Sequence, residues 1–209
     1  MAFESERKRE LRRLCTRGGR VKHRTRDVLQ PGDTLHVTLK VHAHVPSLRR
    51  KRVIQEFERC FRAAKEREGF RLLQYAVMSN HLHLIVEADD RRSLSRGMQG
   101  LNIRLAKAIQ RLFGLTGQIF RDRYFARMLK FSRDVHRVLR YVIQNARRHG
   151  IPLPAGEYDP FSSARYCRQC GSTPREDPRD WPVHWLPSGH LFQGGGCVPA
   201  DYVPGFLTG

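Results

Sequence analysis

The chain has 209 residues, with 39 Lys and Arg against 20 Asp and Glu, a formal net charge of +19 and a sequence pI near 10.8. This length predicts one main domain with appendages, and the excess of positive charge indicates a polyanionic partner, nucleic acid ahead of an anionic membrane surface. No apolar run approaches the roughly 20 residues of a membrane-spanning helix, so we expect a cytosolic protein. Five irregularly spaced cysteines indicate reduced thiols.

Positive charge is concentrated in the first part of the chain. Residues 151–209 hold only 4 of the 39 Lys and Arg but 6 of the 20 Asp and Glu. We therefore expect a basic N-terminal arm at residues 1–32, a main domain at residues 33–150, and a Pro- and Gly-rich C-terminal extension at residues 151–209. The contact with a polyanion is expected in the first two parts.

The main domain is predicted to begin with a strand and a helix. Residues 34–43 alternate apolar and polar side chains with a period of two, which predicts a strand. Ser47 then offers an N-cap for a helix that Gly69 ends. The apolar side chains that repeat at helical spacing between them are Val53, Phe57, Cys60 or Phe61, and Ala64.

Two further predicted strands form a hairpin. Residues 71–79 make the first, and the tight connection Ser79–Asn80 leads into the second at residues 81–88. Three apolar residues are expected on one side of the first strand: Leu73, Tyr75 and Val77. Because side chains alternate across a strand, His81 and His83 share one face of the second. Its other face is apolar, with Leu82, Leu84 and Val86.

The rest of the domain predicts a helix, a strand and a helix. Ser93 caps a helix with a single apolar stripe, which Gly114 ends. Residues 117–130 alternate basic and apolar side chains, which predicts a fourth strand. Ser132 then begins a third helix that runs to His149.

This order of elements predicts an α+β fold, a ferredoxin-like βαββαβ sandwich with an antiparallel sheet and an additional helix. Both crossover helices would lie on the same sheet face, against the apolar side of the histidine strand. His81 and His83 would then lie on the open face, where the third helix is free to cover them.

The third helix carries polar side chains that suit this open face. Tyr141 and Asn145 are four residues apart and therefore neighbours on one side of the helix. Two imidazoles give a divalent cation two ligands, and Asn145 could supply an oxygen as the third. Gln144 also lies beside Tyr141 and stays open as that ligand, although the interval of four favours Asn145. A tyrosine here could attack a phosphorus whose oxygens the ion polarises.

Basic side chains of the last predicted strand and helix suggest contacts with nucleic acid. In the strand they are interleaved with aromatic residues, as in grooves that bind single strands by stacking. On the helix they suit phosphate contacts as a group. The residues predicted to bind DNA are Arg121, Arg123, Tyr124, Arg127, Lys130, Arg137 and Arg148.

Several motifs occur in an order that resembles a known family. They are the Asn-His-Leu-His-Leu run at residues 80–84, the spacing from Tyr141 to Asn145, the Arg-Asp-Arg-Tyr segment at 121–124, His36-Val-Thr38 and the Phe-Ser-Ser-Ala-Arg segment at 161–165. Together they resemble the single-tyrosine transposases of the His-hydrophobe-His class, and most of all their REP-associated branch. The resemblance covers roughly residues 33–166.

The resemblance implies a metal-dependent nuclease and strand transferase that acts on single-stranded or hairpin DNA. By position, Tyr141 would be the nucleophile that forms a 5′-phosphotyrosyl link and releases a 3′-hydroxyl. His81, His83 and Asn145 would hold Mg²⁺ or Mn²⁺. The sequence leaves open whether the protein is a monomer or a homodimer, and whether Tyr141 acts within its own subunit.

Two other interpretations use the same sequence. A non-catalytic nucleic-acid-binding module of the RNA-recognition type shares the fold and the basic surface. Its central strands should carry stacking aromatics, which residues 34–43 and 81–88 lack. Cys167 and Cys170, with two later histidines, fit the spacing of a structural Zn²⁺ site. Prolines in the connecting segment disfavour the helix that presents those histidines in a zinc finger.

Overall fold

The computed structural model describes residues 28–153, 159–166 and 182–183 of the chain. Most of the predicted N-terminal arm and the Cys167–Cys170 pair lie outside these residues. The elements in chain order are β1 (Asp33–Lys40), α2 (Lys51–Arg62), β2 (Glu66–Arg67), β3 (Phe70–Val77), β4 (His81–Ala88), α3 (Arg91–Phe113), β5 (Phe125–Met128), α4 (Ser132–Ile143), α5 (Asn145–Arg148) and the 3₁₀ helix η1 (Ser163–Tyr166).

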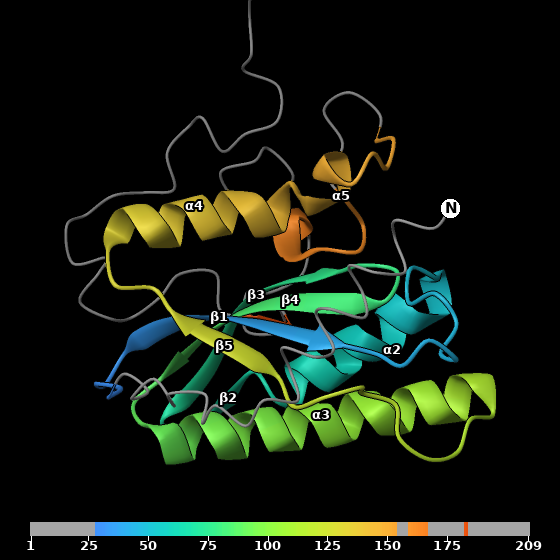
Figure 1. Cartoon of the computed structure of the whole chain (residues 1–209), viewed down its shortest axis with the longest axis horizontal. Helices are drawn as coiled ribbons and strands as arrows, with labels where there is room; N and C mark the ends of the chain where they lie inside the picture. Colours follow the sequence, from blue (N-terminus) through green and yellow to red (C-terminus); the bar gives the residue numbers. More distant parts are fainter. Residues whose placement is uncertain (1–27, 154–158, 167–181, 184–209) are drawn as a thin grey trace, which may run out of the picture.

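The strands form one antiparallel sheet in the order β2-β3-β4-β1-β5. Helices α2 and α3 cover one face of the sheet, and α4 lies across the other (Figure 1). This is the ferredoxin-like arrangement with an additional helix, so the predicted fold class is confirmed. Strand β2 is an addition that pairs with the start of β3. Among the described residues, no helix is long and apolar enough to cross a membrane.

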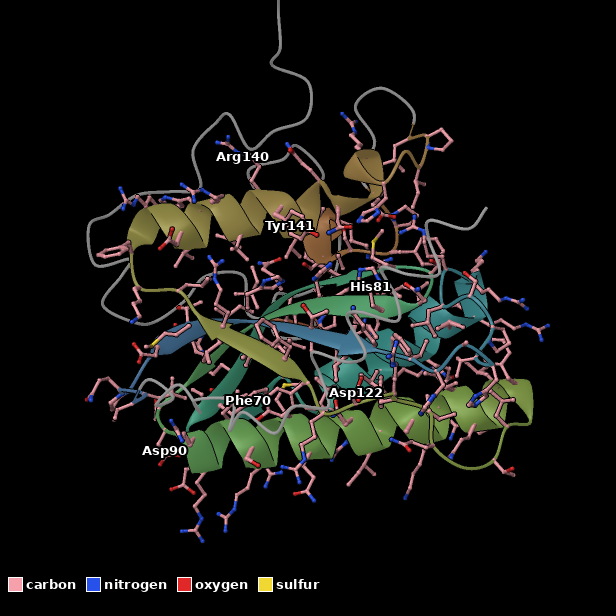
Figure 2. All side chains as sticks on the ribbon, in the orientation of Figure 1. Phe70, His81, Asp90, Asp122, Arg140 and Tyr141 are labelled. Carbon is pink, nitrogen blue, oxygen red and sulfur yellow. The ribbon has the colours of Figure 1, made fainter. Side chains whose placement is uncertain are left out.

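The larger core lies between the sheet and helices α2 and α3. Alternate residues of β1 and β4 enter it, as their period of two predicts. These are Leu35, Val37 and Leu39 of β1 and Leu82, Leu84 and Val86 of β4. Phe70 of β3 lies between the sheet and α3 (Figure 2). A Cβ at Gly97 would stand 2.2 Å from the Phe70 ring, so the absent side chain lets α3 approach the sheet this closely.

A second, smaller core holds α4 on the opposite face of the sheet. The apolar stripe of α4 consists of Val135, Val138, Leu139 and Val142. It packs against Leu73 and Ala76 of β3 and Ile85 of β4, and Tyr141 is partly buried at this contact. The predicted cover of the histidine face by the third helix is therefore present.

A β-bulge in β3 supplies part of the floor beneath α4. The register of β3 with β4 shifts between Leu72 and Gln74, so an extra residue faces α4. The prediction that Leu73 lies beside Tyr75 and Val77 is therefore wrong. Tyr75 and Val77 belong to the larger core, whereas Leu73 belongs to the smaller one.

Local signals misplaced both ends of the first helix and the cap of the second, whose predicted end at Gly114 is confirmed. Helix α2 has Arg50 as its N-cap and ends at Arg62, so Ser47 does not cap it and Gly69 does not end it. Ser47 instead accepts a hydrogen bond from the backbone N–H of Arg49. Helix α3 is capped by Asp90, whose carboxylate accepts from the backbone N–H of Ser93. Ser93, the predicted N-cap, therefore donates the capping hydrogen bond, and Asp90 accepts it.

The predicted fourth strand and third helix are also shorter than expected. Of residues 117–130, only Phe125–Met128 pair as β5, together with an isolated bridge between Phe120 and Val41. The helix predicted over residues 132–149 is divided at Gln144, whose φ of −95° and ψ of 10° are not helical. Asn145 therefore begins the short helix α5.

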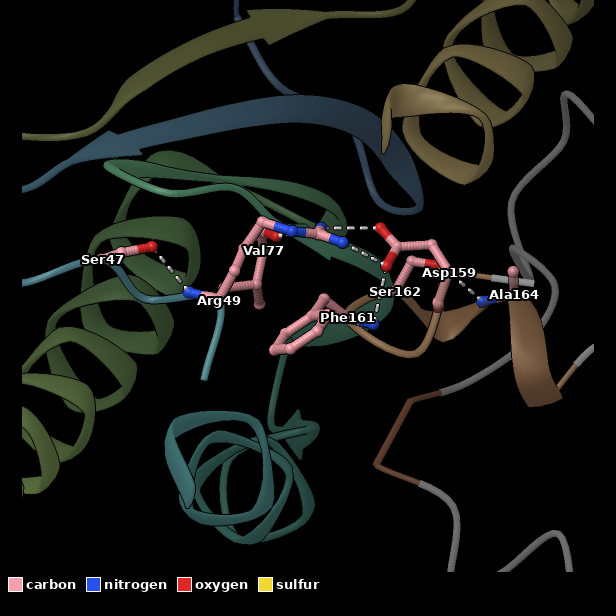
Figure 3. A network of polar contacts seen from close by, with 7 residues as sticks. All are labelled: Ser47, Arg49, Val77, Asp159, Phe161, Ser162 and Ala164. Carbon is pink, nitrogen blue, oxygen red and sulfur yellow. Dashed lines mark hydrogen bonds and ion pairs between the residues drawn. The ribbon is translucent and has the colours of Figure 1, made fainter. Parts of the chain in front are cut away.

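A buried ion pair fastens the segment after α5 to the sheet (Figure 3). Arg49 donates to both carboxylate oxygens of Asp159, at 2.9 and 2.8 Å, and to the carbonyl of Val77 at 3.0 Å. Its guanidinium lies 4.4 Å from the centre of the Phe161 ring. Phe161 in turn accepts from the N–H of Val77 at 2.8 Å. Residues 159–166 are thus held along the part of β3 that β2 leaves unpaired.

We expect Asp159→Ala to lower the free energy of unfolding by about 3–5 kcal/mol, because the Arg49 charge would stay buried without its partner. The two side chains are 13% and 1% exposed. Urea denaturation followed by circular dichroism measures the change. Asp122→Ala is the control, since its ion pair with Arg121 is largely exposed and should contribute about 1 kcal/mol or less. Equal losses in the two variants would contradict the prediction.

Candidate functional site

Three histidines form a continuous row on the sheet face beneath α4. His81 and His83 come from β4, and His36 comes from β1. His36 Nε2 lies 3.0 Å from His83 Nδ1, and His83 Nε2 lies 3.1 Å from His81 Nε2. The rings of His36 and His83 are stacked, with centroids 5.1 Å apart. His81 and His83 therefore direct their Nε2 atoms at one another.

The outer nitrogens of the two β4 histidines have partners. Asn80 Oδ1 accepts a hydrogen bond from His81 Nδ1 at 2.8 Å, which leaves His81 Nε2 with a lone pair. His83 Nδ1 faces His36 Nε2, with Thr38 Oγ1 at 3.4 Å. Both rings are thus fixed with Nε2 toward the space between His81 and His83.

Burial keeps these imidazoles neutral. Burial, and then the neighbouring His36, His81 and His149, lower the pKa of His83 to about 3. Burial and then Arg127 lower the pKa of His36 to about 4. The pKa of His81 is also lowered, first by burial and then by His149 and Lys40. A neutral imidazole is the form that offers a lone pair to a metal ion.

The α4–α5 unit brings two more rings to the row. Tyr141 lies on the side of α4 that faces the sheet, whereas its neighbour Arg140 points away (Figure 2). The Tyr141 ring centroid lies 5.2 Å from that of His83 and 6.1 Å from that of His36. His149, just after α5, lies 6.2 Å from His81. The structure therefore brings the predicted tyrosine to the predicted histidine pair.

Asn145 is fully buried and stands midway in the sequence between Tyr141 and His149. Among the described residues, neither Oδ1 nor Nδ2 of its amide has a hydrogen-bond partner. Tyr141 and His149 stand four residues before and after it, and both touch the histidine row. The N–H of His149 donates to the Asn145 carbonyl, so helical spacing places Asn145 and His149 on the same side of this last turn. Gln144 is only half-buried.

The predicted DNA-binding residues divide into several groups. Arg121, Arg123 and Lys130 are exposed around β5, and Arg137 is exposed on α4. Arg127 is exposed on β5, opposite His36. Tyr124 instead packs, partly buried, against the larger core. The side chain of Arg148 lies outside what the structure describes.

Sequence reasoning missed His36, Asn80 and His149 as parts of this arrangement. The alternation of β1 had already placed His36 on the face opposite the core, but no spacing linked it to a residue 47 positions away. Pairing of β1 with β4 supplies that link, since Thr38 lies opposite His83 and His36 opposite Ile85. The sequence signal was that β1 and β4 both carry polar side chains on one face, and the predicted topology makes these two strands neighbours.

The domain is thus a ferredoxin-like sheet whose histidine pair faces a tyrosine on helix α4. The sequence model of the IS200-like transposases matches residues 33–145, more than half of the chain. The protein belongs to the IS200-like transposase family, and so to a class of DNA-processing enzymes. A search of curated protein sequences finds no match.

Two solved structures are similar to this chain. A REP-associated tyrosine transposase bound to a REP hairpin has a TM-score of 0.56 and 18% sequence identity, over 78% of this chain and 93% of the other. A proposed transposase from Deinococcus radiodurans R1 has a TM-score of 0.40 and 15% identity, over 52% of this chain and 87% of the other. The first supports the same fold at low sequence identity.

Proposed function

We propose that this protein cleaves and rejoins single-stranded, hairpin-bearing DNA through a covalent link between the DNA and Tyr141. The observation that carries the proposal is the contact of the Tyr141 ring with His83, on a helix that covers the histidine face. Membership of a transposase family supplies the class of reaction. The basic chain supplies a surface for a polyanion.

The histidine pair fits a divalent cation such as Mg²⁺ or Mn²⁺. Two nitrogens that bind one ion at right angles, each about 2.1 Å away, stand about 3.0 Å apart. The Nε2 atoms of His81 and His83 are 3.1 Å apart. Among the described residues, no three His, Cys, Asp or Glu side chains form a ligand group. Within the described part of the chain, a third protein ligand would therefore be of another kind.

The Asn145 amide suits that role. It is buried without a hydrogen-bond partner among the described residues, which is costly unless another group satisfies it. Its carbonyl oxygen is the kind of ligand that Mg²⁺ and Mn²⁺ accept. We assign the third position to Asn145 rather than to Gln144, which is more exposed.

The chemistry is a phosphoryl transfer without oxidation or reduction. The Tyr141 oxygen forms a bond to phosphorus, and the bond from phosphorus to the 3′ oxygen breaks. A proton leaves the phenol and a proton is taken up by the 3′ oxygen, so the products are a 5′-phosphotyrosyl link and a 3′-hydroxyl. A bound cation would stabilise the negative charge that develops on the phosphate oxygens. Attack by a 3′-hydroxyl on the link reverses the reaction and rejoins the strand.

His36 is the positioning residue of this site, because it holds Nδ1 of His83 and directs Nε2 inward. We expect His36→Phe, which keeps a ring but not the hydrogen bond, to weaken Mn²⁺ binding about 10- to 100-fold. His36→Gln can accept from Nδ1 through its amide oxygen and should retain most of the affinity. Electron paramagnetic resonance of free Mn²⁺, titrated into DNA-free protein, measures the difference. Equal affinities in the two variants would reject this role for His36.

The proposed function is tested with the full chain, Mn²⁺ and an oligonucleotide hairpin that carries a single-stranded 5′ extension. We expect a protein–DNA adduct that survives denaturant and does not form in the presence of EDTA. A protein that binds the hairpin but never cleaves it would instead favour a non-catalytic nucleic-acid-binding module.

A further inference from the structure

Strand β5 presents two exposed side chains on the same sheet face as the histidines. In its pairing with β1, Phe125 lies opposite Thr38 and Arg127 opposite His36. Residues directly opposite in an antiparallel pair point to the same side. Ala126, between them, packs against the core on the other face. Phe125 and Arg127, here called the β5 surface, therefore continue the face that carries the site.

Helix α4 leaves the β5 surface accessible. The buried stripe of α4 packs mainly on β3 and β4, while Phe125 is 69% exposed and Arg127 is exposed. Thr38 lies opposite His83 on one side and Phe125 on the other. These three residues form one row across the sheet, and Phe125 stands two strand spacings, about 10 Å, from the line of β4.

The chemistry of the β5 surface suits an unpaired nucleotide. An exposed aromatic ring stacks on the face of a base, which is available only where the strand is not in a duplex. Arg127 can bind a phosphate beside that base. Exposed Arg121, Arg123 and Lys130 around the same strand add positive charge. The charge and the ring together favour single-stranded DNA over an apolar protein partner.

We propose that Phe125 stacks on an unpaired base beside the scissile phosphate, and that Arg127 binds the adjoining phosphate. The β5 surface would thus hold the single-stranded flank of the substrate rather than its hairpin stem. This inference rests on the proposed function, because the position of the scissile phosphate is set by Tyr141 and the histidine pair.

The test uses full-length protein with Tyr141→Phe, so that the probe is not cleaved. The probe is a DNA hairpin with a single-stranded flank that contains 2-aminopurine, whose fluorescence is quenched by stacking. We expect quenching on binding, and its loss in Phe125→Leu together with a roughly 5- to 100-fold weaker affinity. Phe125→Trp should retain both. Arg127→Gln should weaken binding of the flanked hairpin and reduce its dependence on salt.

Matched controls separate the β5 surface from the fold as a whole. Phe113→Leu removes an aromatic ring from α3 on the opposite layer, and Arg96→Gln removes an exposed charge there. Both should leave quenching unchanged, and Phe125→Leu should not alter binding of a hairpin without a flank. Unchanged quenching in Phe125→Leu would overturn the inference, as would an equal loss of affinity for the flankless hairpin.

Two further outcomes have separate meanings. If Phe125→Leu changes only the oligomeric state, measured by analytical ultracentrifugation, the β5 surface is an interface between copies and the inference fails. If quenching depends on Phe125 but the protein with Tyr141 intact never forms an adduct, the β5 surface stands as a binding site and the proposed chemistry fails.

Discussion

We expect the Tyr141→Phe protein to form no covalent adduct with a hairpin oligonucleotide in Mn²⁺, under conditions in which the unmodified chain forms one. Phe lacks the oxygen that would attack phosphorus but keeps the ring that contacts His36 and His83. The site should therefore keep its shape while losing its nucleophile. Denaturing gel electrophoresis of labelled DNA measures the adduct, and filter binding should show hairpin affinity within about twofold of the unmodified chain.

Tyr124→Phe is the matched control, since it removes a phenol oxygen from a tyrosine near β5 that packs against the core. This variant should form the adduct normally. An undiminished adduct in Tyr141→Phe would show that another residue carries the covalent link, and loss of the adduct in both variants would point to an indirect effect on the fold.

We expect His83→Ala to lower metal-dependent cleavage by at least about a hundredfold, because charge stabilisation by a metal ion contributes several kcal/mol to such reactions. His83 also joins the other two histidines of the row, so its removal disturbs both of the short nitrogen contacts. DNA affinity should change little, since exposed Arg and Lys side chains dominate binding to phosphates. Single-turnover cleavage over a range of Mn²⁺ concentrations measures the effect.

His44→Ala is the control for loss of an imidazole outside the site. His44 is exposed and stacks on His42 in the loop after β1. It should leave both the cleavage rate and the Mn²⁺ dependence unchanged. A His83→Ala protein that still cleaves at the normal rate would mean that the histidine pair does not hold the catalytic ion.

Much of the fold follows from periodicity. The alternation in β1 and β4 correctly separated a core face from a polar face, because burial on one side of a strand constrains every second residue. The topology then placed α4 over the polar face, as predicted. Helix ends were less well predicted, because side chains such as Ser47 and Ser93 can bond to the backbone in several local geometries.

The site was predicted in part. The contact between Tyr141 and the histidine pair followed from helix spacing and sheet topology. The division of the helix at Gln144 did not, because no Pro or Gly marks it. The orientation of β5 also needed the pairing register, which decides that Phe125 and Arg127, rather than Tyr124, face the histidines.

Strand β3 contains one residue more than a strict alternation of faces permits. Phe70 and Leu72 are two residues apart, and so are Tyr75 and Val77, as strict alternation requires. Leu72 and Tyr75 are three residues apart, yet all four side chains enter the same core. The odd interval between the two pairs places Leu73 beneath α4. Deleting Leu73 would bring the two pairs into step without a bulge and would remove an apolar side chain from beneath α4. The position of Tyr141 therefore depends on the length of a strand that contributes no side chain to the histidine row.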